Sequence, residues 1–171
     1  AGANVGVFSL FAASYAINGK IISIEADKYD YERLQDNISE NDFKNIFPIN
    51  KALTDQSGYV YLSDSVVREP SNKNFHKENY IFEGKVESIS PDDLIKEFKL
   101  NRIDFLKLDI EGYEYNALLG ANQSMTDGLI DYIQLEYNQT WIEGGGTIQK
   151  VLELAQKNAY TLYRIRANDL L

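Results

Sequence analysis

The amino-acid sequence predicts an α/β domain of three layers, in which helices cover both faces of a mainly parallel sheet. Short apolar runs typical of buried strands alternate along the chain with segments whose apolar residues recur at helical spacing. The chain has 171 residues, of which 44% are hydrophobic and 25% charged, as in one ordinary globular domain. We therefore expect residues 1–171 to form a single domain around a mainly parallel sheet.

The composition excludes several classes of protein. The chain has no cysteine and a single histidine, His76, which rules out disulfide scaffolds, thiolate metal sites and His-rich metal centres. Its net charge of -9 argues against nucleic acid as a partner. The apolar runs are far shorter than the roughly 20 residues of a membrane helix, which argues against a membrane partner. Because no signal peptide opens the chain, we expect a cytoplasmic location.

Both ends of the sequence predict a fragment. Ala1 lies inside a glycine turn of the kind that normally follows a strand. Residues 161–166 have the pattern of a strand, and the turn that begins after them is cut short. We therefore expect an incomplete first strand and an incomplete closing hairpin.

The first part of the chain predicts alternating helices and strands. Asn18 and Gly19 end an apolar helix, and the spacing of Tyr31, Leu34 and Ile38 places them on one face of another helix. In order, we expect an apolar helix over 7–17, a buried strand over 21–25, an amphipathic helix around 31–38, a second strand over 46–53 and a half-buried third strand over 59–62.

The second part begins with a polar stretch and then resumes the alternation. Residues 64–85 lack a clear period, which is typical of a lid or binding loop. Ser90 suits an N-cap and Pro91 the first helical position, so a helix begins there. The remaining predicted elements are a short strand over 86–89, a strand over 103–110, a helix through Ala117–Leu119 that Gly120 ends, a strand over 132–137 and a helix over 148–155.

Polar residues gather where the predicted strands end. In an open parallel sheet, ligands bind at the carboxyl ends of the strands. Four of the five positions there carry a carboxylate, and although one strand-end acid can be a simple turn cap, their convergence indicates a site. The positions are Gly2–Gly6, Glu25-Ala26-Asp27, Leu53-Thr54-Asp55, Asp109-Ile110-Glu111 and Glu136-Tyr137-Asn138.

The first two positions predict a ligand that contains adenosine. Glycines at a strand-to-helix turn let the backbone approach a ligand, because no Cβ intervenes. Glu25 lies 19 residues after Gly6, close to the spacing of about 20 expected of an acid that binds a ribose. Asn4 stands where a dinucleotide fingerprint has its middle glycine, which disfavours an NAD-dependent oxidoreductase. A ligand without phosphates, S-adenosylmethionine, fits better.

The sequence also resembles the FkbM-type S-adenosylmethionine-dependent methyltransferases. The strongest match is the segment from Ile103 to Glu114, and its block Lys107-Leu108-Asp109-Ile110-Glu111-Gly112 is specific when it stands in register with the glycine turn. The other matching segments are Gly2 to Ser9, Ile24 to Asp27, Asn50 to Gly58, and Ser88 to Leu94.

The resemblance implies a Rossmann-like class I methyltransferase fold and methyl transfer from S-adenosyl-L-methionine. The acceptor implied is a hydroxyl on a small molecule, a sugar or another carbohydrate. The glycine turn borders the amino-acid part of the cofactor, Glu25 holds the ribose, Asp55 contacts the adenine, and Asp109 faces the methionyl amine or the acceptor. The cofactor-binding residues implied are Gly2, Ala3, Asn4, Gly6, Glu25, Ala26, Asp55 and Asp109.

The candidate bases for the acceptor proton are Asp109, Glu111 and His76. If the strand continues through Glu111, it and Asp109 point in opposite directions and one alone faces the site. Glu111 is equally suited to cap the next helix, and a lone histidine in a polar loop is usually just solvated. Two carboxylates are too few to predict a metal site.

Several alternatives stay open at this point. The chain could be a non-catalytic or inactive nucleoside-binding fragment that keeps the fold. A nucleic-acid methyltransferase is disfavoured by the acidic balance and by the strand end Asp109-Ile110-Glu111-Gly112. Trp141 and the glycines 144–146 either line an acceptor pocket or form a mobile loop. The oligomeric state is undetermined, a homodimer included.

Overall fold

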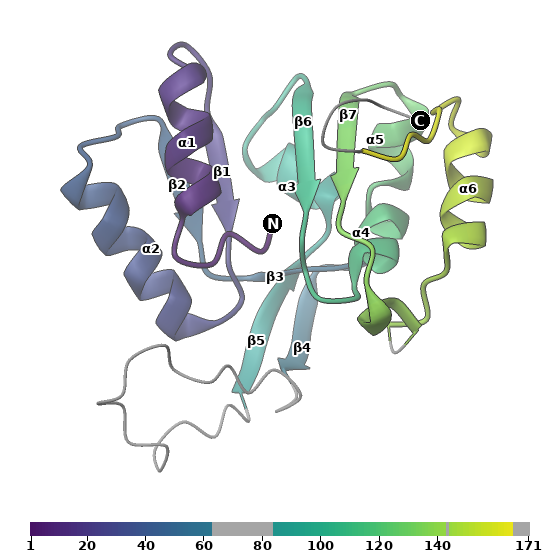
Figure 1. Cartoon of the computed structure of the whole chain (residues 1–171), viewed down its shortest axis with the longest axis horizontal. Coiled ribbons are helices and arrows are strands. Elements are labelled where there is room, and N and C mark those ends of the chain that lie inside the picture. The colour runs from purple at the N-terminus through teal and green to yellow at the C-terminus, as the bar shows by residue number, and fades with distance from the viewer. Residues whose placement is uncertain (63–83, 143, 166–171) are drawn as a thin grey trace.

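The computed structural model describes residues 1–62, 84–142 and 144–165. In this part of the chain, parallel pairs of strands alternate with helices that pack beside them (Figure 1). The predicted α/β class with mainly parallel pairing is therefore confirmed. None of the helices described is both long and apolar enough to cross a membrane.

One half of the fold pairs β1 (Ile21–Ile24) in parallel with β2 (Ile46–Ile49). Two helices pack against this pair, α1 (Val7–Tyr15) and α2 (Lys28–Glu40). The side chain of Asp27 caps α2 by accepting the amide of Asp30. The inner face of α2 is apolar because Leu34 and Ile38 lie on it, and both pack into a cluster with Ala13 and Ile46.

The other half pairs β6 (Ile103–Leu108) in parallel with β7 (Ile130–Leu135). The connection between these strands contains α4 (Glu114–Gly120) and α5 (Asn122–Thr126). After β7 come the 3-10 helix η1 (Gln139–Ile142) and α6 (Ile148–Lys157). The larger core cluster includes the buried Leu108, Ala117 and Trp141 of this half, and it extends to Ile24 on β1.

Residues 1–3 join the two halves, and Figure 1 shows the N-terminus between β1 and β6. The amide of Ala3 donates to the carbonyl of Ile24 at 3.0 Å, and the amide of Asp109 donates to the carbonyl of Ala1 at 3.3 Å. The amino group of Ala1 donates to the carbonyl of Lys107 at 2.7 Å. These bonds bring the glycine turn, the end of β1 and the end of β6 to one place.

A three-stranded sheet has the order β3–β5–β4, and the expected strand that leads into it is broken. The predicted strand over 46–53 is wrong as a single element, because it divides into β2 and β3 (Ala52–Leu53). Asn50 stands at the break and donates to the carbonyls of Glu25 and Ala26, at 2.9 and 3.1 Å. These carbonyls lie beyond β1, so a side chain satisfies them there in place of a continued strand. The chain then leaves β1.

In this sheet β5 (Gly84–Ile89) pairs with both of its neighbours. It is antiparallel to β4 (Gly58–Leu62) and parallel to β3. Ser90 caps the following helix α3 (Pro91–Glu97) as predicted, since its side chain accepts the amide of Asp93.

Two predicted elements, the strand over 161–166 and the helix over 7–17, are present only in part. The predicted strand over 161–166 is wrong for residues 161–164, which form no strand; Ile165 forms an isolated bridge, and Arg166 lies outside the described residues. The short helix α5 was not predicted, and the apolar helix over 7–17 ends earlier, at Tyr15. The predicted lid over 64–85 lies outside the described residues, apart from Gly84 and Lys85, which begin β5.

Candidate functional site

The glycine turn at the start of the chain has a left-handed backbone at three positions. The φ angles are 68° at Gly2, 51° at Asn4 and 95° at Gly6. Asparagine tolerates this conformation better than most residues, so the turn keeps its shape without a middle glycine. A Cβ on Gly2 would lie 1.7 Å from the carbonyl oxygen of Asp109, and one on Gly6 would lie 2.6 Å from Leu34. Both glycines therefore allow close packing within the fold.

Glu25 ties the glycine turn to the end of β1. Its Oε2 accepts the amide of Asn4 at 2.7 Å, and its Oε1 accepts the amide of Asp27 at 2.9 Å. The residue is 8% exposed. Burial raises the pKa of the Glu25 carboxyl, and the two amides partly oppose that rise by stabilising its charge. The structure thus brings the glycine turn and the predicted ribose-binding acid side by side.

Two asparagines brace the same region from neighbouring elements. Asn37 on α2 donates to the carbonyl of Val5 at 2.7 Å. Asn50 holds the carbonyls of Glu25 and Ala26, as described above. The predicted cofactor-binding residues from Gly2 to Ala26 therefore form one connected unit.

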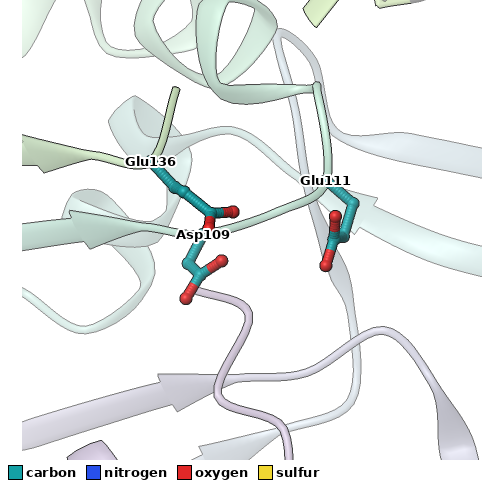
Figure 2. Close-up of side chains that lie close together, drawn as sticks. All are labelled: Asp109, Glu111 and Glu136. Carbon is teal, nitrogen blue, oxygen red and sulfur yellow. The ribbon is translucent and has the colours of Figure 1, made fainter. Parts of the chain in front are cut away.

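Three carboxylates converge at the ends of β6 and β7. One oxygen from each of Asp109, Glu111 and Glu136 lies within 4.8 Å of the others (Figure 2). The expectation that Asp109 and Glu111 point apart assumed a continuing strand, but β6 ends at Leu108 and Glu111 is left-handed, with φ 55°. The backbone reverses there, and both acids reach the same cluster.

Glu136 is a candidate functional residue that the sequence analysis placed at a strand end but did not count among the bases. The parallel pairing of β6 with β7 puts their carboxyl ends together, and the amide of Glu136 donates to the carbonyl of Leu108 at 3.0 Å. That pairing was the signal that could have identified it. Asn138 orients the side chain by donating to Oε2 at 3.1 Å.

The pKa values of Asp109 and Glu136 shift in opposite directions. Desolvation acts to raise the pKa of Asp109, but the Lys107 ammonium, which donates to Oδ2 at 2.5 Å, lowers it below the usual value. Desolvation, the hydrogen bond with the Asp109 side chain and the charge of Asp109 raise the pKa of Glu136, and the charge of Glu111 adds to the rise. The cluster therefore combines an acid that stays ionised with one that binds a proton more readily.

Glu114, the first residue of α4, bonds to the turn that precedes the helix. It is fully buried, and it accepts the amides of Ile110 at 2.8 Å and Gly112 at 3.0 Å. Glu111 itself is exposed and lies in the cluster with Asp109. The interpretation of Glu111 as the helix cap is therefore not supported.

The turn after β6 packs tightly on η1. A Cβ on Gly112 would lie 2.4 Å from the carbonyl oxygen of Thr140. Trp141 is 1% exposed, and its Nε1 donates to the carbonyl of Glu136 at 2.8 Å. The indole thus supports the cluster from inside the core, and it presents no surface to an acceptor.

One predicted site residue that the structure describes has no hydrogen bond to this arrangement. Asp55 is exposed after β3, where it accepts the hydroxyl of Thr54 at 3.1 Å. Among the described residues, no hydrogen bond links Asp55 to the glycine turn or to Glu25. His76 lies outside the described residues.

The cluster of Asp109, Glu111 and Glu136 offers oxygen ligands of the kind that a hard divalent cation prefers. Two of the three carboxylates already accept hydrogen bonds, from Lys107 and Asn138. Exposed acidic groups commonly cluster without an ion. The geometry by itself assigns no metal to these residues.

The fold and the site together define a class. Parallel strands, a glycine turn and an acid at the end of the next strand are the features of Rossmann-like nucleoside-binding domains. The family model of the methyltransferase FkbM domain matches residues 1–162. The chain therefore belongs to the FkbM methyltransferase family, and it is a methyltransferase.

Individual relatives agree with this assignment. The chain is 26% identical, over 198 aligned positions, to methyltransferase sdnD of Sordaria araneosa. The alignment covers 98% of this chain and 74% of that relative. The crystal structure of methyltransferase FkbM from Methylobacillus flagellatus KT superposes with a TM-score of 0.52 at 19% identity, and this likeness concerns the fold. The match covers 74% of this chain, which spans about 28% of that longer protein.

Proposed function

We propose that the chain uses S-adenosyl-L-methionine to methylate a hydroxyl oxygen on a small molecule, a sugar or another carbohydrate. The observation that carries the proposal is the 2.7 Å hydrogen bond from the amide of Asn4 to Glu25. It joins the glycine turn to the acid that ends the neighbouring strand, and these are the two elements needed to hold one nucleoside.

The donor set fits this cofactor. Each oxygen of Glu25 accepts one backbone amide and keeps a further lone pair for a ribose hydroxyl. Asp109 offers a carboxylate for the methionyl ammonium. The residues assigned to the cofactor in this proposal are Gly2, Ala3, Asn4, Gly6, Glu25, Ala26 and Asp109, with Asp55 as the contact for the adenine.

The carboxylate cluster supplies a place for the proton that the acceptor hydroxyl loses. S-adenosylmethionine, when bound, supplies an electrophilic methyl group on a sulfonium. Asp109, Glu111 and Glu136 can orient the hydroxyl, and Glu136 is a better proton acceptor than Asp109 because its pKa is raised whereas that of Asp109 is lowered. Correct alignment contributes up to about 7–11 kcal/mol in such reactions, and a positioned base contributes roughly 10²–10⁴-fold.

Calorimetric titration with S-adenosylhomocysteine and with NAD tests the cofactor assignment. We expect the chain to bind the first and not the second. Glu25→Gln keeps the size of the side chain and removes its charge and one acceptor, so S-adenosylhomocysteine should bind about tenfold more weakly or worse. Glu153→Gln, at an exposed position on α6, is the matched control and should bind like the parent.

Two outcomes would contradict the proposal. Failure of the parent chain to bind S-adenosylhomocysteine would contradict the cofactor assignment. Equal affinities of the Glu25 and Glu153 variants would contradict the ribose role of Glu25. Transfer of a labelled methyl group to a panel of hydroxyl-bearing small molecules and sugars then identifies the acceptor.

A further inference from the structure

We infer that Glu114 is a positioning residue, which fixes the turn after β6 so that Asp109 and Glu111 both face the cofactor and acceptor side of the site. This inference rests on the proposed function, because it takes the carboxylate cluster as part of the site. Glu114 is not among the three carboxylates of the cluster, and its hydrogen bonds are to the backbone of the turn.

The contacts of Glu114 are those of a clamp. Its two carboxylate oxygens accept the amides of Ile110, at 2.8 Å, and Gly112, at 3.0 Å. These amides stand immediately before and after Glu111. The side chain is fully buried, so water does not compete for either bond.

The conformation at Glu111 explains why a clamp is needed. Its φ of 55° is unfavourable for a residue with a β-carbon, and Gly112 follows it with φ 103°. A turn of this kind persists when the surrounding structure holds it on both sides. Without the two hydrogen bonds, Glu111 is expected to return to an extended conformation, which would direct its side chain away from Asp109.

The bonds serve the turn more than they serve the helix. Both amides belong to residues that precede Glu114, the first residue of α4, whereas the N-cap of that helix, Tyr113, makes no side-chain capping bond. Burial of a carboxylate without an ionic partner is costly unless hydrogen bonds stabilise its charge. In the part of the chain that the structure describes, no ion pair includes Glu114. A hydrophobic side chain at position 114 would fill the same space without the cost of burying a charge. The carboxylate of Glu114 therefore serves to bond the turn and not only to fill the core.

Two substitutions separate geometry from charge. Glu114→Gln keeps the length of the side chain but replaces one carboxylate oxygen by an NH₂ group. That group is a donor and cannot accept a backbone amide, so one of the two bonds is lost. Glu114→Asp keeps the charge and shortens the reach by one methylene, so both bonds cannot form together. Glu153→Asp and Glu153→Gln are the matched exposed controls, and circular dichroism with thermal unfolding establishes which variants are folded.

The first measurement is amide hydrogen exchange in the free protein. We expect exchange at one or both of the Ile110 and Gly112 amides to quicken by at least about tenfold in each Glu114 variant, while amides of the β1–β2 pair keep their rates. Unchanged exchange at both amides in a folded variant would overturn the inference. This measurement needs no cofactor, so it stands apart from the proposed function.

The second measurement is a double-mutant cycle on S-adenosylhomocysteine affinity with Asp109→Asn. If Glu114 acts through Asp109, Glu114→Gln weakens binding about tenfold in the parent and has little further effect in the Asp109→Asn background. Additive losses would overturn the inference while leaving the proposed function intact. Absence of binding by the parent chain would overturn the proposed function and, with it, the positioning role.

Discussion

The amide of Asn4 donates a 2.7 Å hydrogen bond to Oε2 of Glu25, and this bond connects two segments that lie 21 residues apart in the sequence. It crosses from a left-handed glycine turn to the end of a parallel strand. A second amide, from Asp27, occupies the other carboxylate oxygen at 2.9 Å. One buried side chain, Glu25, thus holds the backbone of the glycine turn and the backbone at the start of α2.

Gly2→Ala should disrupt the junction between the turn and β6. Its Cβ would lie 1.7 Å from the carbonyl oxygen of Asp109, and the residue has φ 68°. Gly128→Ala is a matched control, because Gly128 has φ 67° with no atom within 4 Å. We expect Gly128→Ala to lower the free energy of unfolding by about 1 kcal/mol, because alanine is strained at a positive φ. Gly2→Ala should lower it by roughly 2–3 kcal/mol more, because of the clash. Urea unfolding measures both, and equal losses would show that the contact with Asp109 is unimportant.

Lys107→Gln should raise the pKa of Asp109. Desolvation already acts in that direction, and the Lys107 ammonium is the largest influence that holds the pKa down, ahead of the hydrogen bond with Glu136 and the charge of the N-terminal amino group. Carboxyl carbon NMR titration reports the change. Lys96→Gln is the comparison, since Asp93 also accepts the hydroxyl of Ser57 and should keep a lowered pKa without the lysine. An unchanged pKa of Asp109 in the Lys107→Gln variant would show that the lysine is not what lowers it.

Stability should depend on pH through the buried glutamates. Burial raises the pKa of Glu25 and of Glu114 above the ordinary value of 4.5. An acid with a raised folded-state pKa binds more protons when folded, so the free energy of unfolding falls as pH rises from about 4.5 upward through that pKa. Glu114→Gln removes one such group and should flatten this dependence between pH 4.5 and 7, measured by urea unfolding. A steeper dependence in the variant would contradict the sign.

Trp141→Phe should destabilise the loop that carries Glu136. The indole ring is buried, and the substitution removes the 2.8 Å hydrogen bond from Nε1 to the carbonyl of Glu136. Losing that bond and part of the packed ring should cost about 2–4 kcal/mol. Tyr132→Phe, at an exposed position on β7, is a control for aromatic replacement. A loss below about 0.5 kcal/mol would show that the indole bond contributes little.

The acid that ends β1 illustrates what residue spacing predicts. Glu25 was selected because it follows Gly6 at the interval of a β-α-β unit, and the structure places it against the turn. Ser90 was selected as a cap from its place before Pro91, and it caps α3. Such features depend on local geometry, which repeats with fixed periods along the chain.

Other parts of the site depended on contacts that no period encodes. Glu136 meets Asp109 because β6 and β7 pair in parallel, and Glu111 turns toward them because Glu114 clamps the amides beside it. The division of the strand over 46–53 depends on Asn50 bonding back to the end of β1.

The sequence by itself determined the α/β class, the order of its main helices and strands and the pairing of the glycine turn with Glu25. The tertiary structure alone decided which acids converge and how the backbone reverses after β6. Hydrophobic period and turn residues act over a few positions, whereas strand pairing and a buried carboxylate join groups whose proximity exists only once the chain has folded.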